Sequence, residues 1–124
     1  MEEVAKKEVQ DLLQKFAKED KEIGGLVVFD EKTEEIIATT YSSEKAKEVI
    51  AVRKEYRNLG VKAEKIYPAG KWNWGMTSLA RYVEFGTNLV GDYQLAGEFT
   101  EAHSPSACIE DALEISLMIN DILS

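Results

Sequence analysis

The chain has 124 residues, of which 23 are acidic and 15 are basic, and its formal net charge is −8. Such a charge repels the phosphates of nucleic acids and anionic lipid headgroups, so neither is an expected partner. The sequence contains no apolar run of about 20 residues, the length that a membrane-spanning helix needs. We therefore expect a cytoplasmic protein that folds as one domain over residues 1–124.

The sequence offers few residues for metal or cofactor chemistry. It contains a single cysteine, Cys108, and a single histidine, His103. A lone cysteine cannot form an internal disulfide, and this pair is too small a set of ligands for a structural zinc. Phosphate-binding glycine loops and the common hydrolase motifs are also missing. We expect no cofactor and no metal.

The N-terminal half predicts a helix, a β-hairpin and a second helix. Apolar residues recur at helical spacing over residues 2–21, which predicts an amphipathic helix. The continuous apolar run at residues 26–29 predicts a strand that is covered on both faces, and the loop DEKTEE and the β-branched EIIATTY complete a hairpin. A serine at 42 or 43 then caps a helix that runs to Leu59, with Gly60 after its C-terminus.

The C-terminal half predicts three strands and a final helix. VKAEKIYPAG, residues 61–70, predicts a strand that Pro68 ends, and alternation over residues 76–99 predicts two long strands joined by a turn at FGTNL. Ser104 is placed to cap the last helix. The expected fold is α+β, with a five-stranded antiparallel sheet, flanking helices and the element order α-β-β-α-β-β-β-α.

Both tryptophans of the chain lie in the segment GKWNWGM, residues 70–76. If this segment is extended, Trp72 and Trp74 point to the same side of it. One interpretation is an aromatic platform for a ligand or for a partner's side chain, with Tyr82 also in its lining. The alternative is a cap over the end of the core, which we favour because tryptophan is usually buried, and we expect one ring to be partly exposed.

Arg81 alternates with Leu79, Val83 and Phe85, so the pattern places it on an apolar face. There its guanidinium could bind an anionic ligand or an interface carboxylate through two parallel hydrogen bonds. The alternative is a position near a strand end, from which the side chain reaches water.

Two helices contain candidate interface residues. In the second helix Val49, Val52 and Tyr56 belong to an apolar stripe. In the last helix Ser116 and Asn120 lie near the middle of an apolar arc that is too wide to face a single surface. This polar pair fits an inter-subunit hydrogen bond, or a local one in which Ser116 bonds back to the carbonyl of the preceding turn.

Cys108 lies five residues after His103, in the first turn of the last helix, where the helix dipole favours a thiolate. A nucleophilic thiol is one interpretation of this pair. The acidic neighbours Glu110 and Asp111 oppose it, because they raise the pKa of a thiol. A buried structural cysteine and an exposed histidine are the favoured interpretation.

The hairpin also resembles a known family. Gly25, the run from Leu26 to Phe29, the acidic turn at Asp30 and the second strand from Ile36 to Thr40 resemble the start of a Roadblock-type domain, the fold of dynein light chains and bacterial MglB. The element order resembles that family along nearly the whole chain. The turn DEKTEE and the segment GKWNWGM depart from the family pattern. The resemblance implies a dimer joined through the second helix and sheet edges, which acts as a scaffold or regulator of a small GTPase or a motor complex.

Three functions are consistent with these features. The favoured one is a non-enzymatic dimerisation and interaction module, because it requires no catalytic motif. The first alternative is a small-molecule sensor with an aromatic pocket near Trp72 and Trp74. The second is a small thiol enzyme that uses Cys108 and His103.

Overall fold

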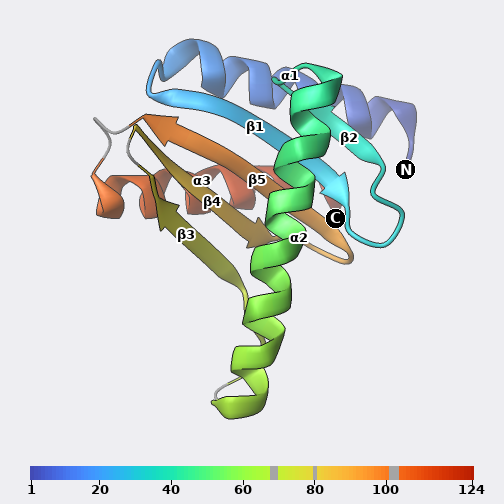
Figure 1. Ribbon diagram of the computed structural model, residues 1–124. Coiled ribbons are helices and arrows are strands. Elements are labelled where there is room, and N and C mark those ends of the chain that lie inside the picture. Colours follow the sequence, from blue (N-terminus) through green and yellow to red (C-terminus); the bar gives the residue numbers. More distant parts are fainter. Residues whose placement is uncertain (68–69, 80, 101–103) are drawn as a thin grey trace.

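The computed structural model describes residues 1–67, 70–79, 81–100 and 104–124. Its elements follow the predicted order, and its strands form one antiparallel sheet with the order β2-β1-β5-β4-β3 (Figure 1). This confirms the predicted fold class. The elements are α1 (Glu3–Glu19), β1 (Ile23–Asp30), β2 (Ile36–Thr39), α2 (Ser43–Ile66), β3 (Trp74–Ser78), β4 (Tyr82–Asn88), β5 (Tyr93–Thr100) and α3 (Pro105–Leu123).

The helices lie on both faces of the sheet. Helix α2 crosses the front face in Figure 1, and α1 and α3 lie behind the sheet. The C-terminal end of α2 extends beyond the sheet in this view, so part of the helix has no strand beneath it. Within the described ranges, no helix combines the length and the apolar character needed to cross a bilayer.

The larger core lies between the sheet and helices α1 and α3. Val9 and Leu13 of α1 and Ile115 and Ile119 of α3 are buried against apolar side chains of every strand. Strand β1 contributes to both faces of the sheet. Val28 belongs to this core, and its neighbour Val27 belongs to the core on the other face. Each Å² of apolar surface buried stabilises the folded state by about 25 cal/mol, so this core supplies most of the stability of such a domain.

The core under α2 is smaller, and it is made of short side chains. Ala46 and Ile50 of α2 pack on Val27 and Phe29 of β1 and on Ala96 of β5. Together the two cores cover β1 on both sides, as its unbroken apolar sequence predicts. The α2 core ends at β5, so the α2 side of strands β4 and β3 is left for polar groups and open space.

The predicted third strand is wrong. Residues 61–66 continue α2, and the strand begins only at Trp74. Gly60, predicted to follow the helix, lies inside it and is buried. A glycine is tolerated there because Trp72 packs directly on its bare Cα. Pro68, predicted to end the strand, lies outside the described residues.

The predicted turn at FGTNL is also wrong. Residues 85–88 belong to β4, which pairs with β5 as far as Asn88. The reversal lies later, around Gly91, whose φ of +64° is a left-handed conformation that glycine adopts without strain. The alternating pattern therefore identified the two strands but not the point where one ends.

Candidate functional site

The α2 side of β4 and β5 contains a buried arginine, Arg53. This α2 residue is 2% exposed, and its Nε and Nη2 donate to Oε1 of Gln94 at 3.2 and 2.6 Å. Its guanidinium carbon lies 4.1 Å from the centre of the Trp72 ring, a distance typical of cation–π stacking. Burial lowers the pKa of Arg53 to about 10, although Glu84 acts in the opposite direction. The guanidinium therefore remains charged at neutral pH.

A polar network around Arg53 holds the chain that leads into β3. Nε2 of Gln94 donates to Oδ1 of Asn88 at 2.7 Å, and Nδ2 of Asn88 donates to the carbonyl of Trp72 at 2.9 Å. The amide of Trp72 donates to Glu64 of α2 at 2.5 Å. These bonds fix the Trp72 backbone between the helix and the sheet.

Two glycines make the approach of Trp72 and Arg53 possible. A Cβ at Gly60 of α2 would lie 2.4 Å from the Trp72 ring, and a Cβ at Gly86 of β4 would lie 2.5 Å from Cδ of Arg53. Real Cβ atoms do not come this close to other atoms. The helix backbone, the indole, the guanidinium and the strand backbone thus form four layers in direct contact, which any side chain at either glycine would separate.

Two carboxylates face the same space. Glu84 of β4 and Glu98 of β5 are direct partners in the antiparallel register. Burial raises the pKa of Glu84 to about 7, and Glu98 adds to the rise while Arg53 opposes it. The hydroxyl of Tyr41 is buried and finds no hydrogen-bond partner among the described residues. Burial, with Glu98 as a secondary cause, raises the pKa of Tyr41.

Two open grooves flank Glu84, which lines both. The first, of about 200 Å³, lies beside the N-terminal half of α2, and the second, of about 280 Å³, lies beside its C-terminal half and contains Arg53 and Trp72. Exposed apolar side chains stand along them: Val52 and Leu59 of α2 are 43% and 60% exposed. Leu79 and Tyr82 line the first groove, and Tyr56 lines the second.

We expect the stability of the fold to depend on the protonation of Glu84. Because its pKa is higher in the folded chain than the ordinary value of 4.5, the folded state binds more protons than the unfolded state between about pH 4.5 and 7. The free energy of unfolding should therefore fall as the pH rises through this window. Glu84→Gln should be about 1–2 kcal/mol more stable than the wild type above pH 7, after allowance for screening by water.

Urea unfolding at a series of pH values measures this effect. At pH 4, which is below the pKa of Glu84 in both states, the wild type and Glu84→Gln should unfold at nearly the same urea concentration. A wild type whose stability is constant or rises between pH 5 and 7, with Glu84→Gln showing the same profile, would contradict the expectation.

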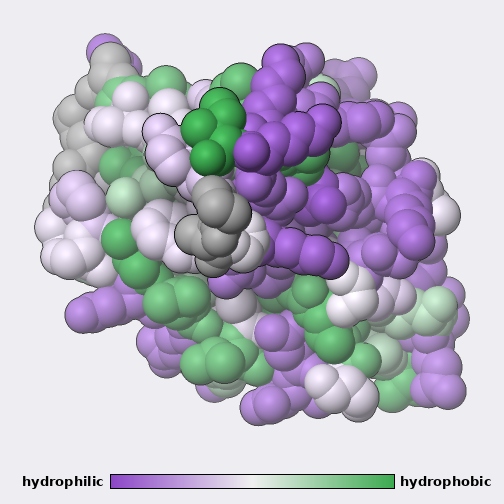
Figure 2. Space-filling view, turned by 90° about the horizontal axis from the view of Figure 1, so that it is seen from below, coloured by the Kyte–Doolittle hydropathy of each residue, from purple (hydrophilic) through white to green (hydrophobic). Residues whose placement is uncertain are grey.

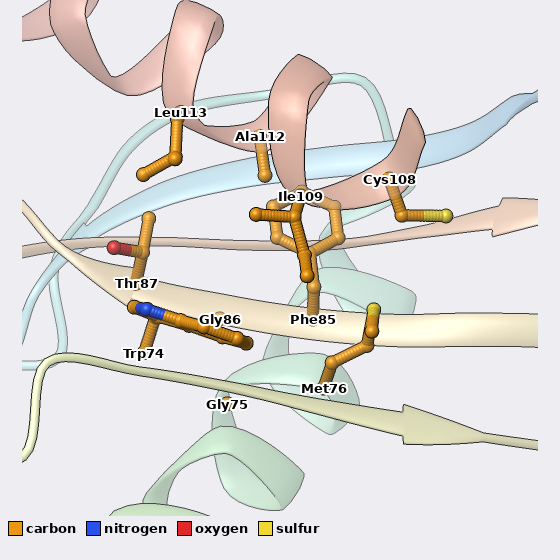
Figure 3. Close-up of a pocket in the computed structure, with 10 residues that line it drawn as sticks. All are labelled: Trp74, Gly75, Met76, Phe85, Gly86, Thr87, Cys108, Ile109, Ala112 and Leu113. Carbon is orange, nitrogen blue, oxygen red and sulfur yellow. The ribbon is translucent and has the colours of Figure 1, made fainter. Parts of the chain in front are cut away.

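The two tryptophans do not share a side, as they would if the whole segment were extended. Trp72 lies on the α2 side, whereas Trp74 contacts the α3 side through a crevice that it lines with Leu113, Ile109 and Met76 (Figure 3). The alternation of an extended strand begins at Trp74, and residues 70–73 precede the strand. The two rings therefore do not form one platform. Trp74 is 44% exposed and Trp72 is half-buried, so both rings are partly exposed rather than one.

Arg81 does not lie on an apolar face. It precedes β4 in the β3–β4 connection and is exposed, and Leu79 on the other side of residue 80 is exposed as well. Val83 and Phe85, which share the predicted pattern, are buried in the strand. The alternation fails at Arg81 because the strand begins only at Tyr82, which lines the first groove.

The residues predicted for an interface lie in two settings. Val52 is exposed on α2, and Val49 and Tyr56 are half-buried beside the grooves. Ser116 is buried and donates to the carbonyl of Ala112 at 2.7 Å, the local alternative. Asn120 accepts from the amide of Val90 at 2.8 Å, which ties α3 to the β4–β5 turn.

Cys108 is buried at the start of α3. Burial raises the pKa of its thiol, and Asp111 and Glu22 add to the rise. This shift is opposite to the one that activates a nucleophilic cysteine. His103, the proposed partner, lies outside the described residues.

Sequence reasoning missed Arg53, Gln94 and Glu84. The buried side of α2 follows Ala46, Ile50, Arg53 and Gly60, and the more apolar stripe through Val52 and Leu59 is turned outward. One signal was available, because Arg53 lies three residues after Ile50 and seven before Gly60, on the same helical face. Gln94 and Glu84 alternate with core residues of β5 and β4 and gave no such signal.

The sequence matches no protein-family model and no curated protein. The structure is similar to Myxococcus xanthus MglB, with a TM-score of 0.81 and 11% identity over 99% of this chain and 92% of that one. An MglB with a tetrameric arrangement has a TM-score of 0.81 at 9% identity, over 98% and 92% of the two chains. A Roadblock/LC7 domain from Streptomyces avermitilis has a TM-score of 0.74 at 12% identity, over 90% and 91%. The protein therefore has a Roadblock-like fold.

Proposed function

We propose that the protein is a cytoplasmic, non-enzymatic interaction module that forms a homodimer through the outer side of α2 and the free edge of β3. The observation that carries this proposal is the row of exposed apolar side chains along α2 and the residue after it, in the β3–β4 connection and at the start of β4. Its members are Val52, Leu59, Ile66, Tyr67, Leu79 and Tyr82. Apolar rows of this length on a small acidic protein usually mark a binding surface.

The edge of the sheet supports the same surface. Within the described residues, β3 pairs with β4 alone and is the last strand of the sheet. Its other edge presents unpaired backbone amides and carbonyls, which readily bond to a strand of another chain. Because α2 extends beyond the sheet on this side, a second copy at the edge of β3 would meet the exposed stripe of α2 as well.

We further propose that the assembled module acts on a small GTPase or another signalling protein as a scaffold or regulator. The similarity of the fold to MglB and Roadblock domains supports this step. The tetrameric arrangement of one similar MglB supports assembly as a property of this fold. The inner polar cluster of Arg53, Gln94 and Asn88 would then serve to hold Trp72 and β3 in position beneath the interface.

Sedimentation velocity of the full chain over a range of concentrations tests the dimer. We expect the wild type to sediment as a dimer at micromolar concentration, and Val52→Glu/Leu59→Glu to sediment as a monomer, because two carboxylates would be buried in an apolar contact. Val4→Glu is the matched control, since Val4 is an exposed apolar residue of α1, outside this surface. A wild type that is monomeric at every concentration would overturn the proposal.

A further inference from the structure

Helix α3 carries an apolar stripe that the core does not use. Ile109, Leu113 and Leu117 follow one another at successive turns, and they are displaced around the helix from the buried line of Ala112, Ile115 and Ile119. Leu117 is 67% exposed, and Leu113 is also exposed. This stripe lies on the face of the sheet opposite to α2, so it is separate from the surface proposed for the dimer.

Trp74 extends the stripe onto the sheet. Its indole lies beside Ile109 and Leu113 and forms one wall of a crevice between β3 and α3 (Figure 3). The crevice offers about 20 Å³, room for about one water molecule, so it is too small for a metabolite. It suits the tip of a single apolar side chain that approaches from outside.

The other end of the stripe reaches the β4–β5 turn. Val90 is exposed there, and its amide donates to Asn120, which lies one turn beyond Leu117 on α3. Trp74, Leu113, Leu117 and Val90 thus form one strip, which we name the α3 strip. Figure 2 shows apolar side chains gathered in the lower part of the molecule when it is viewed from below.

The charges that α3 itself places beside the α3 strip are all acidic. From Pro105 to Leu123 the helix has four acidic residues and no lysine or arginine. Glu110, Glu114 and Asp121 lie on the outer side of the helix, next to Leu117. A second copy is a poor occupant, because a two-fold contact would bring this acidic border against itself.

We propose that the α3 strip docks an amphipathic segment of a partner protein, with one apolar face bordered by lysine or arginine. The apolar residues of the segment lie on Leu113 and Leu117, with one side chain at the crevice beside Trp74. Its basic residues lie against Glu110 and Glu114. This site is independent of the α2 surface, so a homodimer presents it twice.

A synthetic peptide of leucine and lysine, 14 residues long with its leucines on one helical face, is the probe. In the control peptide every lysine is replaced with glutamate. Fluorescence anisotropy of the labelled peptides should show binding of the lysine peptide to the full chain and none of the glutamate peptide. In Leu113→Ser/Leu117→Ser the affinity should fall at least tenfold, and in the matched control Met118→Ser, an exposed α3 residue outside the α3 strip, it should be unchanged.

The outcomes separate the possible occupants. Equal binding of the lysine peptide to the wild type and Leu113→Ser/Leu117→Ser would mean general attraction by the acidic surface, and it would overturn the proposal. Loss of the dimer in Leu113→Ser/Leu117→Ser, with circular dichroism unchanged, would mean that a second copy covers the α3 strip. That result would also overturn the proposal. The dimer proposed through α2 is judged by Val52→Glu/Leu59→Glu, so the two proposals fail separately.

Discussion

Replacing Gly97 with alanine should lower the free energy of unfolding by about 3 kcal/mol. Gly97 lies in β5, between Leu26 of β1 and Phe85 of β4 in the register. A Cβ at this position would lie 2.3 Å from the carbonyl oxygen of Gly25 and 3.1 Å from the Phe85 ring. The nearest atom belongs to the backbone of a central strand, so the contact cannot be relieved by a side-chain rotation. The sheet must open there, although alanine normally favours a strand over glycine.

Gly75→Ala is the matched control, because Gly75 lies in the edge strand β3. A Cβ there would meet Cζ2 of Trp72 at 3.1 Å, and this side-chain atom can move by the small amount required. We expect a loss below about 1 kcal/mol. Urea unfolding followed by circular dichroism compares the two variants. A Gly97→Ala protein as stable as Gly75→Ala would show that the packing of β5 against β1 is looser than the structure has it.

Replacing Arg53 with alanine should have a similarly large effect, a loss of about 3 kcal/mol. The substitution empties space between α2 and Gly86, removes the stacking partner of Trp72 and takes both donors away from the buried Oε1 of Gln94. Part of this loss is offset because the variant no longer buries a cation, which is itself unfavourable.

Arg53→Met separates packing from charge, because it keeps an unbranched side chain of similar length. We expect it to recover about 1–2 kcal/mol of the loss in Arg53→Ala. It should also raise the pKa of Glu84 further, since Arg53 is the group that lowers it. Carbon-detected NMR titration of the Glu84 carboxyl measures that change. An Arg53→Ala protein within about 0.5 kcal/mol of the wild type would refute the structural role of the cluster.

The sequence was sufficient for the fold wherever the hydrophobic pattern is local. The apolar run at 26–29 predicted a strand covered on both sides, and the capping serine at 104 predicted the start of α3, whose Ser104 Oγ accepts from the amide of Ala107. It was insufficient where a contact distant in the chain decides. Glycine often ends a helix, but Gly60 lies inside one. The indole of Trp72, twelve residues later, takes the space of its missing side chain.

The candidate site was predictable only in part, for the same reason. The α2 stripe was identified from spacing, and Trp72 and Trp74 were identified as large rings near the end of the sheet. Their division between two faces depends on where β3 begins, which the pattern did not show. Arg53 and Glu84 are charged side chains, for which a position under a helix is unusual. The burial of Arg53 is explained only by Gln94 and Trp72, partners that are distant in the chain.

Hydrogen exchange of the β3 backbone tests whether the edge of β3 and the α2 stripe form an interface. The amides of residues 74–78 that do not bond to β4 should exchange at least tenfold more slowly at high protein concentration than after dilution below the dimer dissociation constant. The amides of β1, in the interior of the sheet, should exchange equally at both concentrations. Rapid exchange of the outer β3 amides at every concentration would contradict the proposed interface.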